Sequence, residues 1–243
     1  MTDLIVEISK YLMTFLFALY AYECFSSFRG KLSDEKRQRI FKRQMFLMYL
    51  IHLDAYLAIY AVTDDIEMIL FYVVQVAFAA ITISCYRLIY PRSSGLLVNN
   101  MCMLLCIGMI MLTRLDYASA VKQFAIATAA VAMSLAVPVI IRKFKLLSEW
   151  RLFYAAAGLV SLAVVIVMGR VTGGAMLGFK IGGENGISIQ PSELVKIIFV
   201  FFVASSFKLS LEFKDIVITT AIAAFHVLIL VVSKDLGAAL IIF

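Results

Sequence analysis

The stretch GENGISIQPSELVKIIFVFFVASSF, residues 183–207, decides the fold class. It passes from a glycine-rich segment through Gln190 and Pro191 into an almost unbroken apolar run. A membrane-spanning helix needs about 20 mostly apolar residues, and this run approaches that length. Pro191 suits the first position of such a helix, because its missing N–H would have no partner there. The stretch therefore predicts a helix that starts at a membrane surface and enters the bilayer.

The rest of the chain has the same character. Of its 243 residues, 63% are hydrophobic and 16% are charged, which excludes an ordinary soluble domain and a disordered chain. The basic residues that give the formal charge of +6 lie in short segments between apolar runs. They therefore indicate membrane topology and do not indicate nucleic-acid binding. We predict an all-α, polytopic transmembrane helical bundle with about eight membrane helices and the start of a ninth. The expected helices are 4–25, 45–62, 67–88, 97–113, 122–141, 152–169, 191–207, 215–233 and a run from 236 onward.

The basic segments also predict orientation. Residues 28–43, FRGKLSDEKRQRIFKR, carry seven Lys/Arg against two acids, and such segments stay on the cytoplasmic side. The later segments alternate in agreement with this rule, which places the amino terminus and the glycine-rich residues 170–190 outside the cell membrane. The last run, LGAALIIF at 236–243, is too short to span a bilayer. We expect the chain to be a fragment; the alternative is that this run packs against protein without crossing the membrane.

Charged side chains fall where two of these helices begin. Glu193 and Lys196 are spaced i,i+3, so they share a helix face and can pair. Glu193 also suits an ordinary helix start, with Gln190 before it as the cap, but Lys196 lies deeper and at the wrong end for the helix dipole. Asp235 is either a simple N-cap or part of a polar site. Ionisable groups in membrane spans usually face a bundle interior or a watery cavity. We therefore expect one outer cavity, suited to a phosphorylated head group, that gathers Lys180, Gln190, Glu193, Lys196, Lys234 and Asp235.

The two histidines and two of the cysteines suggest no metal site. His52 and His226 lie in separate apolar runs without companions at ligand spacing, so we interpret them as core or cavity residues. Cys102 and Cys106 are one helical turn apart, but no His or further Cys joins them, and apolar packing is the preferred interpretation.

Three motifs together resemble a known family. ISIQPSELVKIIFVFFVASSF, followed one helix later by SKDLGAALIIF, is similar to the shape, elongation, division and sporulation (SEDS) proteins, the RodA, FtsW and SpoVE group. That family pairs a Q-P-S-E-x-x-K helix start with a later Q-P-D-L-G-T-A-L motif. The first motif is intact here, whereas Ser233 and Lys234 replace the Gln-Pro before Asp235 in the second. Residues 117–137, YASAVKQFAIATAAVAMSLAV, resemble the family's outer loop and second helix. The resemblance covers about residues 95–243, so we predict a SEDS-like core there and an extra three-helix region at 1–94.

The resemblance implies a peptidoglycan glycosyltransferase of the bacterial plasma membrane. Such an enzyme extends glycan strands from lipid II, an undecaprenyl-linked substrate, in cell division, elongation or sporulation. It implies a divalent cation, Mg²⁺ or Mn²⁺, and a class B penicillin-binding protein as partner. The substrate-binding residues would be Glu193, Lys196, Asp235, Gln190 and Ser192, with Lys180 and Lys122 as pyrophosphate contacts. The family's proposed catalytic Asp falls beyond the position of Phe243, so we expect no catalytic residue in this chain.

Two other functions would use the same features. A flippase or transporter of lipid-linked precursors would also place an ion pair and an outward cavity in the membrane, but it should show an inverted repeat, and the sequence has none that we detect. A non-catalytic membrane scaffold that recruits cell-wall enzymes would fit the extra helices and the altered second motif.

Overall fold

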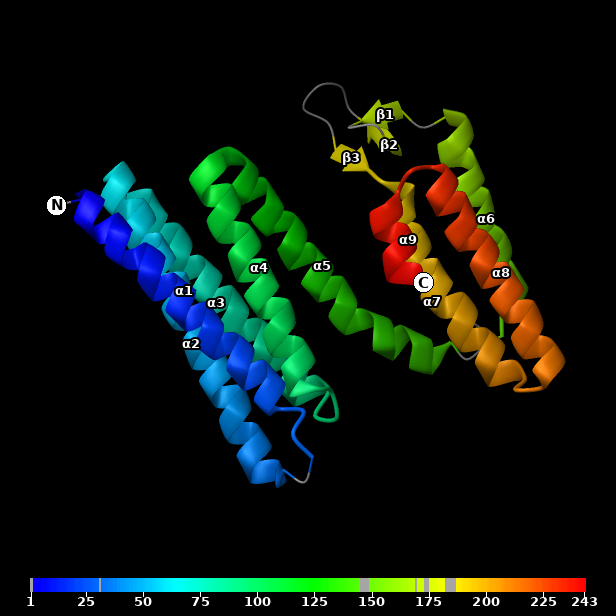
Figure 1. Ribbon diagram of the computed structural model, residues 1–243, viewed down its shortest axis with the longest axis horizontal. Coiled ribbons are helices and arrows are strands. Elements are labelled where there is room, and N and C mark those ends of the chain that lie inside the picture. The colour runs from blue at the N-terminus through cyan, green and yellow to red at the C-terminus, as the bar shows by residue number, and fades with distance from the viewer. Residues whose placement is uncertain (1, 31, 145–148, 169, 173–174, 182–186) are drawn as a thin grey trace. The chain divides into compact units, whose positions relative to one another are not determined.

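Long helices account for most of the computed structural model, which describes residues 2–30, 32–144, 149–168, 170–172, 175–181 and 187–243 (Figure 1). The described residues contain a helix at each predicted position, which confirms the predicted helical membrane bundle. The helices are α1 (Thr2–Ser26), α2 (Asp34–Thr63), α3 (Ile66–Ile89), α4 (Gly95–Leu115), α5 (Tyr117–Lys143), α6 (Arg151–Met168), α7 (Pro191–Leu209), α8 (Phe213–Val232) and α9 (Leu236–Ile242). Within the described part of the chain, six helices, α1–α5 and α8, are long and apolar enough to cross a membrane.

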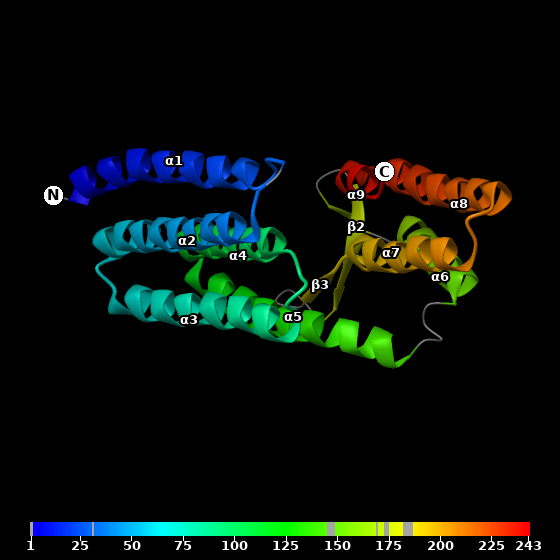
Figure 2. The ribbon, with the colours of Figure 1, turned by 90° about the horizontal axis from the view of Figure 1, so that it is seen from below.

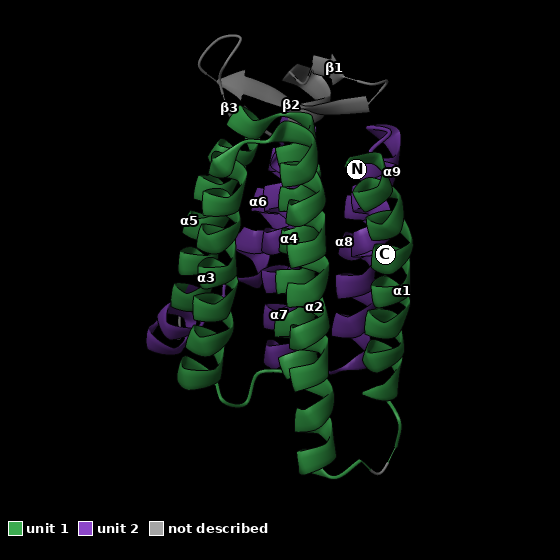
Figure 3. Cartoon of the chain, turned by 90° about the vertical axis from the view of Figure 1, so that its left-hand side faces the viewer, with its two compact units in different colours: residues 1–136 green, residues 137–243 purple. Residues whose placement is uncertain are grey.

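The chain divides into two compact units, residues 1–136 and 137–243, which Figure 3 colours separately. This division follows packing within the chain. The predicted boundary at 94/95 concerned family resemblance instead, and it stays a prediction.

The first unit is built from α1–α4 and most of α5. In this unit α1 packs on α2, and α2 packs on both α3 and α4, as Figure 2 shows. Met48 and Ile51 of α2 are each 1% exposed and pack against Cys102 and Met103 of α4. The predicted packing role of Cys102 is therefore confirmed. Burial of these apolar side chains between neighbouring helices defines the core of the unit.

Helix α2 begins at Asp34, whereas the sequence analysis expected a membrane helix from about residue 45. Its extra turns lie in the basic segment, and Figure 3 shows them extending beyond the neighbouring helices of the same unit. The Ser33 side chain accepts a hydrogen bond from the Lys36 N–H and caps the helix. Glu35 pairs with Arg39 at 2.6 Å, an i,i+4 contact that supports an exposed helix. Capping and side-chain pairing therefore extend the helix past its apolar part.

The second unit contains the end of α5, helices α6–α9 and a small sheet. Helix α7 packs against α6, α8 and α9. Phe202 of α7 is 1% exposed and packs with Tyr154 and Ala155 of α6. Helix α7 carries Glu193 and Lys196 in its first turns and Lys208 in its last turn.

The segment 170–190, expected to be a glycine-rich loop, contains three short strands. They are β1 (Arg170–Thr172), β2 (Ala175–Ile181) and β3 (Ile187–Ile189), paired antiparallel in the order β1-β2-β3. Isoleucine, valine and threonine favour strands, and these residues lie between the glycines. Strand β3 ends one residue before the cap of α7, so the sheet leads directly into the candidate site.

Candidate functional site

Helix α7 begins as the sequence predicted, but with different side-chain contacts. Pro191 occupies the first turn, and Gln190 is the N-cap residue by backbone position. The Gln190 side chain makes no capping hydrogen bond. Glu193 does not reach back either, because its carboxylate accepts a hydrogen bond from the Lys196 ammonium group at 2.7 Å. The predicted pairing of Glu193 with Lys196 and the N-cap position of Gln190 are present, whereas the expected reach of Glu193 back to the unpaired N–H groups of the first turn is absent.

The two members of this ion pair differ in exposure. The Lys196 side chain is 21% exposed and that of Glu193 is 61% exposed. A largely exposed partner contributes little to stability, since solvent screens the attraction. The pair therefore adds little to folding, and its chief effect is to hold a mostly covered ammonium group on the first turns of α7.

The second charged element is formed by the turn between α8 and α9. The Lys234 N–H donates to the Val231 carbonyl at 3.0 Å, and the Asp235 N–H donates to the Leu230 carbonyl at 3.0 Å. These two bonds form a Schellman motif, which ends α8. Lys234 adopts φ 61°, in the left-handed region that glycine normally occupies. The turn places Asp235 at the N-cap of α9, one of the two roles that the sequence left open.

Asp235 connects the two helix starts. One carboxylate oxygen, Oδ1, accepts the Ala238 N–H at 3.1 Å, and the other, Oδ2, accepts the Gln190 side-chain amide at 3.2 Å. The same Gln190 nitrogen lies 3.0 Å from the Ser192 hydroxyl. Asp235 is 9% exposed and Ser192 is 4% exposed. The Asp235 carboxylate is therefore both a helix cap and a contact between segments 45 residues apart.

An apolar layer supports this contact. Val195 of α7 is fully buried and packs with Ala238 and Ala239 of α9. Leu162 of α6 and Leu230 of α8 complete the cluster. Small side chains on α9 let the helices approach closely, which fixes Gln190 and Asp235 within hydrogen-bonding distance.

The structure describes the other two predicted site residues, Lys180 and Lys122, less fully. The backbone of Lys180, in β2, pairs with Ser188 of β3, two residues before Gln190; its side chain is outside the described part of the structure. Lys122 belongs to the first unit, where its charge helps to lower the pKa of Asp116. The main cause of that lowered pKa is a hydrogen bond from the Ser119 hydroxyl. A shared site for Lys122 and Asp235 stays a prediction.

The described residues of this site offer an ammonium group for anion binding and no complete metal site. The Lys196 ammonium group can donate to phosphate oxygens, whereas the two N–H donors of the Gln190 amide are already engaged by Asp235 and Ser192. No three His, Cys, Asp or Glu side chains cluster in the described ranges. Both oxygens of Asp235 already accept hydrogen bonds, and Glu193 is paired with Lys196. These residues therefore do not fit a resident divalent cation without rearrangement.

Both histidines are core residues, as predicted. His52 and His226 are fully buried. The His226 Nδ1 lies 2.9 Å from the Ile222 carbonyl, and its ring stacks on Phe202. A methyl group on Gly158 of α6 would lie 2.6 Å from the His226 Nε2, so glycine is required for this close approach. The sequence contained no signal that paired His226 with Gly158.

Comparison with known protein families identifies a match to the second part of the chain. A family model described as "Cell cycle protein", for the FtsW, RodA and SpoVE proteins, matches residues 95–243. The matched range contains α4–α9 and all of the candidate site. No curated protein and no solved structure gives a significant match to the chain.

Proposed function

The chain belongs to the FtsW, RodA and SpoVE family of cell cycle proteins, and we propose that it provides substrate-binding groups of a peptidoglycan glycosyltransferase. It is a multi-pass membrane protein with a cell-wall function of this family's type. The proposed substrate is lipid II, whose sugar is polymerised with release of undecaprenyl pyrophosphate.

The observation that carries this proposal is the hydrogen bond between Gln190 and Asp235. It joins the Q-P-S-E-x-x-K helix start to the Asp-Leu-Gly segment, the two motifs that define the family resemblance. Segments this far apart in sequence are not generally in contact in a fold. Here they contact each other at adjoining helix starts and form one polar site. A site at helix starts suits a ligand with a charged head group and an apolar tail.

In the proposed role, Lys196 stabilises the negative charge on the departing pyrophosphate. A fixed ammonium group aimed at developing charge is an effective form of electrostatic stabilisation. Asp235 acts as a positioning residue, since its two hydrogen bonds hold the start of α9 against that of α7. Glu193 keeps Lys196 in place, and its carboxylate remains exposed enough to accept a hydrogen bond from a sugar hydroxyl.

Other parts of the proposal rest on family resemblance. They are a class B penicillin-binding protein as partner and a divalent cation, whereas the outward-facing site and the amino terminus outside the cell rest on the distribution of basic residues. A cation bound with the pyrophosphate substrate would need fewer protein ligands, because substrate phosphates supply much of the coordination of Mg²⁺.

The proposal is tested by glycan synthesis from lipid II in liposomes that contain the full-length gene product. We expect Lys196→Gln and Asp235→Ala to lower the rate at least about tenfold, as loss of a charge-assisted contact predicts. Glu212→Ala is the matched control, because Glu212 precedes α8 at the opposite end of α7. Unchanged synthesis in both variants would contradict the site assignment. Co-purification with a penicillin-binding protein, without synthesis by the intact protein, would favour the scaffold function instead.

A further inference from the structure

The first unit contains a polar cleft far in sequence from the candidate site. It has a volume of about 370 Å³ and lies where the early turns of α2, the end of α3 and the start of α4 meet. This volume is within the usual range for small-molecule sites. Its lining includes Lys42 of α2, Arg87 of α3 and Asn99 of α4.

Glu35 and Glu23, near this end of the unit, are engaged by arginines outside the cleft, and Asp34 does not line the cleft. Glu35 pairs with Arg39 at 2.6 Å, and Glu23 pairs with Arg43 at 3.4 Å. Among the residues that the structure describes, no carboxylate lines the cleft. Lys42 and Arg87 make no ion pair and no side-chain hydrogen bond within the described part of the chain, so the cleft carries two uncompensated positive charges. Such a cleft attracts an anion.

Asn99 adds an unused hydrogen-bond acceptor. It is 1% exposed, and its amide nitrogen donates to the Phe41 carbonyl at 3.0 Å and to Gln44 Oε1 at 3.1 Å. Both partners are acceptors, which fixes the orientation of the amide. Its Oδ1 atom is buried and has no partner among the described residues. A buried acceptor without a donor destabilises the folded protein. A ligand hydroxyl that donates a hydrogen bond to Asn99 would remove this free-energy penalty.

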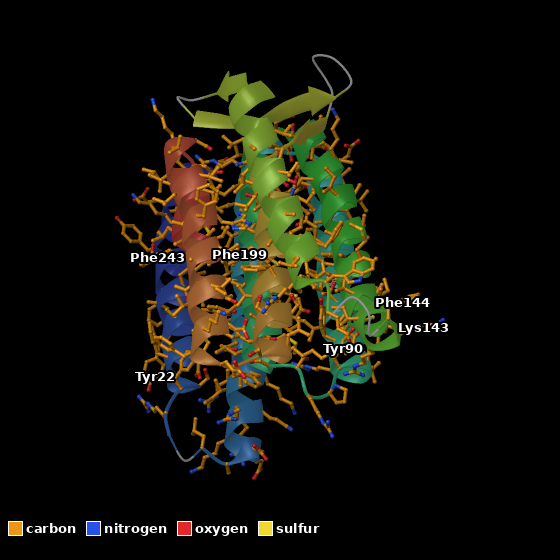
Figure 4. The ribbon with its side chains drawn as sticks, turned by 90° about the vertical axis from the view of Figure 1, so that its right-hand side faces the viewer. Tyr22, Tyr90, Lys143, Phe144, Phe199 and Phe243 are labelled. Atoms are coloured by element: carbon orange, nitrogen blue, oxygen red, sulfur yellow. The ribbon has the colours of Figure 1, made fainter. Side chains whose placement is uncertain are left out.

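The cleft walls are held in place before any ligand binds. The Tyr90 hydroxyl, on the ring labelled in Figure 4, donates to the Leu135 carbonyl of α5. Phe41 packs so closely on Gly95 that a methyl group there would lie 2.7 Å from its ring. Both aromatic rings line the cleft beside the basic groups. A preformed site with apolar walls and basic groups loses little entropy when an amphiphile binds.

We propose that this cleft binds the head group of an anionic phospholipid that carries a free hydroxyl, such as phosphatidylglycerol. Lys42 and Arg87 contact the phosphate diester, and a head-group hydroxyl donates to Asn99 Oδ1. The acyl chains remain in the bilayer beside Phe41 and Tyr90. Basic pockets between membrane helices bind lipid head groups in this way. A lipid is favoured over a soluble phosphate because the cleft lies at the ends of three membrane helices.

The test is native mass spectrometry of the purified chain in detergent, titrated with phosphatidylglycerol or phosphatidylcholine. We expect saturable binding of phosphatidylglycerol, weakened about 30-fold in the Lys42→Gln/Arg87→Gln double variant, since each cation contributes about fivefold. The matched control is Lys36→Gln/Arg114→Gln, which removes two charges that do not line the cleft. All four side chains are exposed, so these changes should leave folding intact, which circular dichroism checks.

Two further ligands test the role of the head-group hydroxyl and whether the ligand is a lipid. Phosphatidylmethanol keeps the phosphate diester but lacks the free hydroxyl, so it should bind more weakly than phosphatidylglycerol; equal affinity would overturn the role of Asn99. Glycerol phosphate at millimolar concentration should not displace the lipid, and displacement would identify a soluble anion as the ligand. Equal phosphatidylglycerol binding by the wild type and the cleft double variant would overturn the whole proposal.

Discussion

The contact between Gln190 and Asp235 can be measured by a double-mutant cycle. Asp235→Ala removes the cap of α9 and the acceptor of the Gln190 amide, each worth about 1 kcal/mol, so the free energy of unfolding should fall by about 2 kcal/mol. Gln190→Ala should cost about 1 kcal/mol. If the two side chains interact, the double variant should lose about 0.5–1.5 kcal/mol less than the sum of the single losses.

The distribution of spectroscopic groups allows each unit to be followed separately. The single tryptophan, Trp150, lies in the second unit, whereas all four cysteines lie in the first. Denaturation by SDS in mixed micelles can therefore be recorded by tryptophan fluorescence and by thiol labelling in the same sample. The Gln190 and Asp235 variants should shift the fluorescence midpoint and leave the thiol midpoint unchanged.

Two results would refute this reasoning. A coupling energy of zero within error would mean that Gln190 and Asp235 do not interact. A shift of the thiol midpoint equal to that of the fluorescence would mean that the effect is not confined to the second unit. Asp235→Asn provides the internal control, because asparagine still caps a helix and should lose less stability than alanine.

Three further predictions follow from local geometry. Gly158→Ala should destabilise the second unit by about 1–3 kcal/mol in the same fluorescence assay, because the added methyl group meets the buried His226 ring. Lys234→Gly should raise stability by about 1 kcal/mol, since glycine adopts φ 61° without strain; an unchanged midpoint would argue against this turn. The Ser119 hydroxyl lowers the pKa of Asp116, so this carboxylate adds stability above its unfolded pKa, near 4, which is lost as the pH falls through the lower folded pKa. Ser119→Ala should raise the Asp116 pKa in a carboxyl ¹³C NMR titration, and no change would contradict the hydrogen bond.

The helices could be predicted from sequence because their causes are local. The start of α7 at Pro191 and the cap of α9 at Asp235 depend on residue types within one turn, and both agree with the structure. The early start of α2 also has a local cause, the Ser33 cap and the acidic residues after it, but the strong basic character of the segment favoured a loop.

The sequence contained no comparable signal for the long-range contacts. Gln190 was expected to cap its own helix, yet its amide contacts a carboxylate 45 residues later, which depends on how α7, α8 and α9 pack. The pairing of Asn99 with Phe41 and Gln44 is of the same kind. Asn99, a polar residue at the start of the mostly apolar helix α4, was a signal of that cleft in the sequence.

Binding of undecaprenyl pyrophosphate to the purified chain tests the central claim most directly, because it measures the site without requiring turnover. The central claim is that the starts of α7 and α9 bind a lipid-linked pyrophosphate. We predict saturable binding that Lys196→Gln weakens about tenfold, as loss of one charge-assisted contact implies. The control Lys214→Gln, at the opposite end of the second unit, should bind as the wild type does. Equal affinity of the wild type and Lys196→Gln would contradict the claim.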